Sequence, residues 1–217
     1  MISYLFSNPL IFFIYLMAIL FAIAIHEFSH AWAADYLGDP TPRLGGRLKL
    51  NPLVHIDKIG ILFLLFFGFG WGKPVQFDPY NLKNPRKDAA IISLAGPSSN
   101  FILAIILSLL LKLFIILQLN FLIIIGSLIF VPVIRMNIVL GVFNLLPIHP
   151  MDGFKIVEGI LPEEKAHEWN QLQRYGMIFL ILLIFPIGGS SMLNNILQPI
   201  VDFLTNLLIT IPKTGII

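Results

Sequence analysis

Long runs that are almost free of charge restrict the folds open to this chain more than any other feature. From Asn8 to Leu37 the only charged residues are Glu27 and Asp35, and further apolar runs cover 89–111 and 121–147. About 20 predominantly apolar residues are enough to cross the hydrocarbon core of a bilayer as a helix. Only 12% of all residues are charged, against about 25% in soluble domains. The sequence therefore predicts an all-α polytopic membrane protein, a helical bundle of about 4–6 transmembrane segments.

The apolar stretch between Lys58 and Lys73 is too short for a comfortable span. Its fourteen residues, 59–72, would reach only about 21 Å as a helix. Its Phe and Gly content favours a small membrane-embedded re-entrant or β-hairpin element instead. Backbone of that kind must be covered by protein or face a water-filled cavity.

Two further helical segments are expected towards the C-terminus. A helix that starts in water at Pro162 is expected to enter the membrane after Arg174 and to end near Pro186. The last apolar segment, 192–211, is interrupted by several Asn residues and by Pro199. We expect it either to span the membrane or to lie against the bundle.

The distribution of basic residues predicts an orientation. Lys and Arg cluster in 43–87 and again in 155–174, and none precedes Arg43. By the positive-inside rule both clusters face the cytoplasm and the N-terminus faces out. Residues 26–30 and Asp152 then lie at the same, cytoplasmic, depth. We therefore expect a multi-pass integral membrane protein whose active site is nearer the cytoplasmic side.

Composition excludes several classes of site and partner. There is no cysteine, so disulfides and thiolate metal sites are excluded, and any metal must be held by His, Asp or Glu. The net charge is only +2, and no basic tract could follow a phosphate backbone, so nucleic acid is not an expected partner.

The sequence His26-Glu27-Phe28-Ser29-His30 forms an H-E-x-x-H motif within the first apolar run. Residues i and i+4 share one face of a helix, so both imidazoles can bind one metal ion, with Glu27 beside them as general base. The alternative is a pair of packed core histidines bonded to neighbouring carbonyls. A bilayer weakens this alternative, because an ionisable residue near the centre of a helix costs about 2.5–3.5 kcal/mol there. A bound divalent cation would offset that cost.

A catalytic zinc ion needs a third protein ligand and an open position. Asp152 is favoured, because it lies in a Pro-Met-Asp-Gly turn at the depth expected for the histidines. Its alternative role is an Asx turn or a helix cap. The rival ligands are His149, His55 and His167, and of these His149 is the strongest.

Three separated motifs resemble the site-2 protease family, peptidase family M50, and in particular its compact prokaryotic branch of intramembrane zinc metalloproteases. The resemblance covers about residues 15 to 185. Two sequence stretches, 47–57 and 71–75, are also similar to that branch. The motifs are His26-Glu27-x-x-His30, Gly96-Pro97-x-x-Asn100, and Asn144-Leu145-Leu146-Pro147 followed by Pro150-Met151-Asp152-Gly153.

The resemblance implies a set of roles for named residues. It implies that His26, His30 and Asp152 bind one catalytic Zn²⁺ ion and that Glu27 activates water. Asn100 is expected near the reaction, either donating to the oxyanion or substrate or bonding across helices. Asn144 and His149 are candidates for an extra ligand or for a contact with one. His149 and Lys58 depart from the family's usual residues at their positions, and cobalt or iron would suit the same ligands.

The resemblance also implies an organisation and an activity. We expect one membrane-embedded metalloprotease domain over 1–217, without a PDZ or CBS domain, in a prokaryotic cell membrane. Its substrates would be transmembrane proteins, cut within or near their spans in regulated intramembrane proteolysis, with a hairpin around 59–77 receiving them. The partners are then these substrates and the lipid bilayer, and homo-oligomerisation is left open.

Two other functions remain in view. A metal-handling membrane transporter would also carry intramembrane His, Glu and Asp, but it would spread them along a helix instead of gathering them at one depth. An inactive relative could bind membrane proteins without cutting them. Glu27 argues against that reading, because metal binding alone does not need it.

Overall fold

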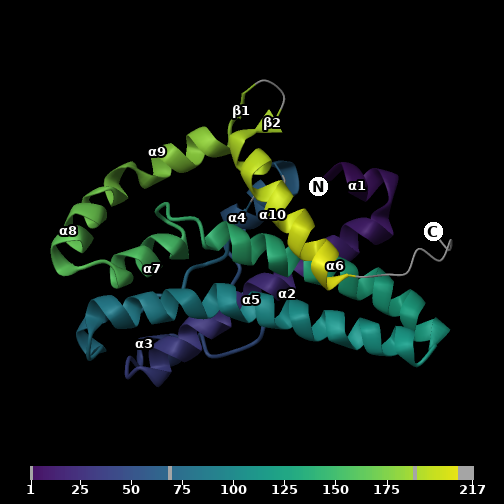
Figure 1. Ribbon diagram of the computed structural model, residues 1–217, viewed down its shortest axis with the longest axis horizontal. Helices are drawn as coiled ribbons and strands as arrows, with labels where there is room; N and C mark the ends of the chain where they lie inside the picture. The colour runs from purple at the N-terminus through teal and green to yellow at the C-terminus, as the bar shows by residue number, and fades with distance from the viewer. Residues whose placement is uncertain (1, 68–69, 188–189, 210–217) are drawn as a thin grey trace.

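Three long apolar helices form the centre of the fold, which a computed structural model describes for residues 2–67, 70–187 and 190–209 (Figure 1). They are α2 (Pro9–Tyr36), α5 (Pro85–Ile116) and α6 (Asn120–Asn144). Within the described ranges these are the helices long and apolar enough to cross a membrane. The prediction of an all-α membrane protein is confirmed.

The remaining described elements are short. Figure 1 shows α7, α8 and α9 as an arc that leaves the end of α6 and returns to α10. A pair of two-residue antiparallel strands joins α9 to α10. The elements are α1 (Ile2–Ser7), α3 (Thr41–Leu44), α4 (Lys58–Phe67), α7 (Asp152–Ile160), α8 (Glu163–Gln171), α9 (Gln173–Ile184), β1 (Pro186–Ile187), β2 (Ser190–Ser191), α10 (Met192–Leu208), and the 3₁₀ turns η1 (Pro52–Val54) and η2 (Pro79–Asn81).

Stripes of mostly small residues, spaced four apart, allow α2 and α5 to approach closely. A membrane gives helices no hydrophobic drive to associate, so they pack where small side chains bring the backbones together. Rows of residues four apart form the ridges that interlock when helices cross. The buried stripe of α2 is Ala18, Ala22, His26, His30 and Ala34, and that of α5 is Ile92, Gly96, Asn100, Ala104 and Ser108.

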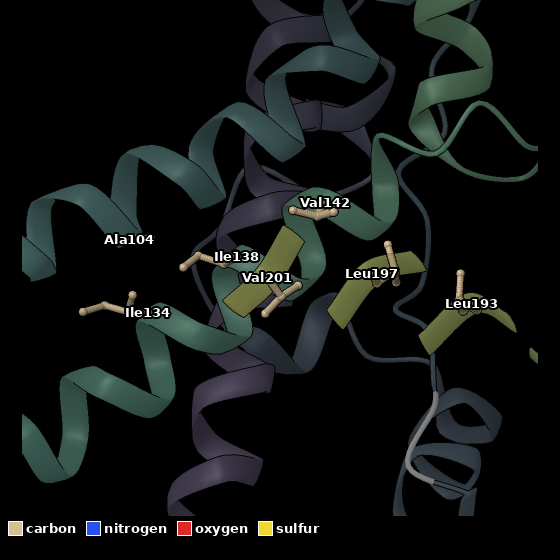
Figure 2. Close-up of a cluster of buried hydrophobic side chains, with 7 residues drawn as sticks. All are labelled: Ala104, Ile134, Ile138, Val142, Leu193, Leu197 and Val201. Carbon is tan, nitrogen blue, oxygen red and sulfur yellow. The ribbon is translucent and has the colours of Figure 1, made fainter. Parts of the chain in front are cut away.

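Helix α10 lies across α6 and closes one side of the bundle (Figure 1). Figure 2 shows the apolar cluster between them, to which α10 contributes Leu193, Leu197 and Val201. Two polar contacts add to this packing. Ser108 Oγ donates to Leu208 O over 2.5 Å, and Arg135 pairs with Asp202 at 3.2 Å. Of the two arrangements expected for 192–211, the described part lies against the bundle, and 210–211 fall outside the described residues.

The helix expected from Pro162 to Pro186 is interrupted. It forms as α8 and α9, with Leu172 between them outside both helices. Trp169 of α8 stacks on Phe154 of α7 at 5.2 Å between ring centroids and donates its Nε1–H to Phe154 O at 3.0 Å. This contact ties α8 to α7. Helix α9 has 12 residues, about 18 Å, which is shorter than a bilayer span.

The segment after Lys58 folds back on itself. It forms α4 and then an extended arm, defined here as residues 70–77, while 68 and 69 lie outside the described residues. The arm is anchored by an isolated antiparallel bridge between Ile56 and Gly72 and by Lys73 N–H donating to His55 O at 2.7 Å. Among the described residues this single bridge is all the β-pairing of the element.

Asp39 joins the end of α2 to the loop that leads into α5. Its fully buried carboxylate accepts hydrogen bonds from the backbone and hydroxyl of Thr41, from Asn81 Nδ2 and from Asp78 N–H, at 2.6 to 3.1 Å. Burial opposes ionisation, but these hydrogen bonds outweigh it, so the pKa of Asp39 lies below its usual value. The ionised form therefore stabilises this end of the bundle.

We expect Asp39→Asn to lower the free energy of unfolding by about 1–3 kcal/mol at neutral pH. Because the folded pKa is depressed, the carboxylate's contribution is complete above about pH 4, the unfolded value, and is lost as pH falls through the folded pKa. The gap in melting temperature between the two proteins should therefore shrink on acidification. Thermal unfolding in detergent, measured at neutral pH and again at acidic pH, tests this. The substitution Glu164→Gln, at an exposed position, is the control. Equal melting temperatures at neutral pH would contradict the prediction.

Candidate metal centre

Three atoms that can bind a metal converge where α2 meets the start of α7. His26 Nε2 and His30 Nε2 are 3.0 Å apart, and they lie 3.1 and 3.3 Å from Asp152 Oδ2. Both histidines are buried, and Asp152 is nearly so. Within the described residues these three make up the group that could hold a metal ion.

The other ring nitrogen of each histidine fixes which atom faces the group. His26 Nδ1 lies 2.7 Å from Asn100 Oδ1, and His30 Nδ1 lies 2.7 Å from Ile92 O. Both partners are acceptors, so each Nδ1 carries the hydrogen and each Nε2 presents a lone pair. Three electron-rich atoms then face one another at 3.0 to 3.3 Å, an arrangement that a cation stabilises.

The residues fit a zinc ion. Zinc bound to nitrogen and oxygen ligands at about 2.0–2.2 Å in a tetrahedron places those ligands about 3.4 Å apart, close to the spacing found here. Asp152 Oδ2 is buried and, within the described residues, has no hydrogen-bond donor. An unpaired buried carboxylate oxygen is costly unless it binds a cation. Two imidazoles and a carboxylate are also a usual donor set for catalytic zinc.

Gly96 leaves the space in which the three atoms meet. A Cβ at this position would lie 2.4 Å from His30 Nε2 and 2.7 Å from His26 Cε1. Any side chain there would push directly on the ligand atoms. The glycine of the Gly96-Pro97 pair therefore serves the site as well as helix packing.

Close packing of the turn between α6 and α7 positions Asp152. A Cβ on Gly153 would lie 2.3 Å from Leu145 O, so the first turn of α7 rests directly on the backbone at the end of α6. Phe154 is 2% exposed and anchors the same turn. The helix begins at Asp152 itself, so its carboxylate projects from a fixed start and not from a mobile loop.

Glu27 lies beside the group without belonging to it. Its Oε2 accepts the Val75 N–H at 3.1 Å, and its Oε1 is close to Gly72. The extended arm thus runs directly along the glutamate. Arg47 links η1 to the arm by donating to Val54 O at 2.5 Å and to Lys73 O at 3.3 Å.

The other predicted site residues lie around this group. Asn100 is fully buried and bonded to His26, which favours its interhelical alternative. Asn144 donates to Leu140 O at 2.9 Å on its own helix. His149 packs edge-on against Phe154, and burial together with Lys155 lowers the pKa of its ring, which favours the neutral imidazole. His55 is buried and donates to Lys49 O, and His167 is exposed on α8.

Two groups that contribute to the site were not predicted from the sequence. One is the backbone carbonyl of Ile92, whose position beside His30 no residue type reveals. The other is Asn137, fully buried in α6 and hydrogen-bonded to Asn100 at 2.8 Å. The only available signal for Asn137 was an amide inside an apolar span, a feature it shares with Asn144.

Comparison with known proteins gives the same assignment as the motifs. A family model described as "Peptidase family M50" matches residues 14–119 and 117–185. The chain belongs to this family.

Named relatives span several prokaryotic organisms. "Putative zinc metalloprotease YwhC" of Bacillus subtilis is 37% identical over 177 residues, which cover 80% of this chain and 81% of that protein. "Putative zinc metalloprotease Rip2" of Mycolicibacterium smegmatis is 29% identical, with 77% and 65% covered. "Zinc metalloprotease MJ0392" of Methanocaldococcus jannaschii is 29% identical, with 74% and 38% covered. The chain thus spans less than two thirds of the last two, and no solved structure matches it.

In this member of peptidase family M50, Gly96→Ala should strongly weaken zinc binding, because its methyl group would occupy the space between the two histidines. Zinc content of the purified protein, measured by elemental analysis after dialysis against a weak chelator, tests this.

The matched control is Gly126→Ala, on α6. A Cβ there would meet Leu111 Cδ1 at 3.2 Å, the flexible end of a side chain. This variant should retain zinc. If Gly96→Ala bound zinc as tightly as the wild type, the convergence of ligands on this space would be wrong.

Proposed function

We propose that the protein is a zinc metalloprotease that hydrolyses peptide bonds within or near transmembrane segments of other membrane proteins, with Glu27 as general base. Membership of peptidase family M50 and the names of its relatives support the zinc metalloendopeptidase. The observation that carries the proposal is the convergence of His26, His30 and Asp152 at 3.0 to 3.3 Å, with Glu27 next to a ligand on the same helix.

The proposed ligands leave room for chemistry. When bound, zinc supplies a Lewis acid that lowers the pKa of a coordinated water to about 7 and polarises a substrate carbonyl. His26, His30 and Asp152 would hold the ion and would leave it able to take a further ligand, a water molecule or the substrate. The Nδ1–H bonds of His26 and His30 keep the Nε2 lone pairs facing the site, and Asp152 would add a negative charge.

Glu27 is placed to take and return a proton. The Val75 N–H holds one of its oxygens at 3.1 Å, which restricts the rotation of the carboxylate and leaves its other oxygen without that bond. A base must lie within hydrogen-bond reach of the proton that it removes. Holding Glu27 from the arm while His26 is held from α5 keeps the base and the ligand in a fixed relation.

The extended arm is the proposed contact for the substrate strand. A peptide bond inside a transmembrane helix is shielded by its own hydrogen bonds, so cleavage needs local unwinding and new partners for the freed backbone groups. An exposed strand edge supplies such partners by β-augmentation. The inward N–H groups of Lys73 and Val75 are used within the protein. Because successive N–H groups of an extended chain point to opposite sides, that of Gln76 faces outward.

The proposed location is a prokaryotic cell membrane, with the site towards the cytoplasmic side. His30 lies six residues before the end of α2, about 9 Å along the helix. The basic stretch 43–87 begins just beyond that end. By the positive-inside rule, this basic stretch supports a cytoplasmic location for this end of the helix.

The arrangement argues against a metal-handling transporter. The proposed ligands and Glu27 gather at one level where α2, α5 and α7 meet, instead of following a helix from end to end. A transport path would need polar groups along the membrane depth. On α2 the residues one and two turns before His26 in the buried stripe are Ala22 and Ala18, both fully buried.

The first test separates the base from the ligands. Glu27→Gln should bind zinc as the wild type does yet lose cleavage of a single-span membrane substrate by at least about 100-fold, because a neutral amide cannot accept the proton. His26→Ala should lose zinc as well as cleavage. Zinc content and product formation by purified protein in lipid vesicles provide the two readouts. If Glu27→Gln cleaved at the wild-type rate, the role of base would belong elsewhere.

A second test addresses the arm. Gln76→Pro removes one outward N–H while proline remains compatible with an extended edge. We expect lower cleavage, mainly through a higher KM, with zinc content unchanged.

Gln76→Ala keeps the N–H and is the control, expected to cleave normally. Full activity of Gln76→Pro would exclude strand addition at this position without affecting the zinc site.

A further inference from the structure

A chain of buried side-chain hydrogen bonds leads from His26 through α5 to α6. His26 Nδ1–H donates to Asn100 Oδ1 at 2.7 Å, and Asn100 Nδ2 donates to Asn137 Oδ1 at 2.8 Å. Asn137 Nδ2 in turn donates to Val133 O at 2.8 Å. Both asparagines are fully buried, so water cannot replace these partners without a rearrangement.

The orientation of the amides in this chain is fixed at the end away from His26, by the partners of Asn137. An amide has an acceptor end and a donor end. Asn100 Nδ2 uses both its hydrogens, one on Asn137 Oδ1 and one on Ala22 O at 3.1 Å. Turning the amide over would set its oxygen against these two acceptors. Asn137 cannot turn over to compensate, because its own nitrogen is held by Val133 O.

The orientation of the Asn100 amide determines which ring nitrogen of His26 carries the hydrogen. With Asn100 Oδ1 towards His26, the imidazole must carry its hydrogen on Nδ1 and present the Nε2 lone pair to the metal site. With the amide reversed, Nδ1 would accept and Nε2 would carry the hydrogen, which would block the ligand atom. The partner that fixes the tautomer of a metal-binding histidine is in effect part of the site.

His30 needs no such chain. Its Nδ1–H donates to the backbone carbonyl of Ile92 at 2.7 Å, a group that has no donor end and cannot turn over. The two histidines are thus oriented by different means, and only His26 depends on side chains that could adopt a wrong orientation.

We infer that Asn137 is a positioning residue for the metal ligand His26 and acts through Asn100. The inference rests on the zinc site of the proposed function. It also gives Asn100 a role that the sequence left open: with Oδ1 on His26 and both amide hydrogens used inside the bundle, Asn100 orients a ligand and does not face the substrate.

Zinc affinity tests the inference without an assay of activity. Purified full-length protein in detergent is titrated with zinc in competition with a chelator of known affinity. Loss of an outer partner of a metal-binding histidine weakens metal affinity about 10–100-fold, and we expect this loss for Asn137→Ala and for Asn100→Ala. The double variant should match Asn100→Ala within about twofold, because Asn137 has no further route to His26.

Asn137→Asp is the conservative variant. As a neutral acid its carbonyl oxygen accepts from Asn100 and its O–H donates to Val133 O, so zinc affinity should return to within about threefold of the wild type. If Asn137→Ala does not fold, Asn137→Leu takes its place, since it fills the space without an acceptor. Elution as a single species and thermal unfolding establish that each variant is folded.

Ser108→Ala is the matched control. It removes another buried interhelical hydrogen bond from α5, the one to Leu208 O, and should leave zinc affinity unchanged. Wild-type affinity in Asn137→Ala, or a double variant weaker than Asn100→Ala by the full single effect, would overturn the inference and leave the zinc site intact. If the wild type bound no zinc, the proposed zinc site would fall and this inference with it.

Discussion

Three ligand atoms held about 3 Å apart are the constraint on which the rest of the structure depends. Bringing His26, His30 and Asp152 together requires the end of α2, the first half of α5 and the turn after α6 to meet at one point. Two contacts around that point are close because of glycines: Gly96 lies against the histidines, and Gly153 lies against the backbone at the end of α6. A bound cation would balance the electrostatic repulsion between the three atoms, and the packing limits how far they can separate.

An apolar solvent explains why few polar groups are buried in the bundle and why the side chains around the two histidines have defined partners. In hydrocarbon an unsatisfied polar group costs several kcal/mol. Both ends of the buried Asn100 and Asn137 amides make hydrogen bonds, as do the Nδ1 atoms of both histidines. Ser108 follows the same rule farther along α5. The buried side chains of His26, Asn100 and Ser108 thus act as a proposed ligand, as a group that orients this ligand, and as a clamp between helices.

The extended arm connects recognition to chemistry in the proposed mechanism. It is built from outside the bundle, through the Ile56–Gly72 bridge and the contacts of Arg47, yet one of its N–H groups reaches Glu27. A substrate strand added to its outer edge would be aligned by the same backbone that aligns the base. A single element would then align both the substrate strand and the base, and no further segment would have to fit between the closely packed helices.

The sequence by itself determined the long helices and the chemistry of the residues that they carry. Uncharged runs predicted the long helices, because hydrocarbon admits few charges, and the i, i+4 spacing placed both histidines on one face, because helix geometry is local. The tertiary structure decided the partners. Three contacts depend on how segments far apart in sequence pack against each other. They are the carbonyl that accepts from His30, the amide that orients His26 and the N–H that donates to Glu27. Asn137 and Asn144 look alike as letters in an apolar run, yet only Asn137 meets Asn100, because packing of α6 on α5 sets which face each amide occupies. The residue pattern determines which side chains share one face of a helix, and long-range packing determines which groups those side chains contact.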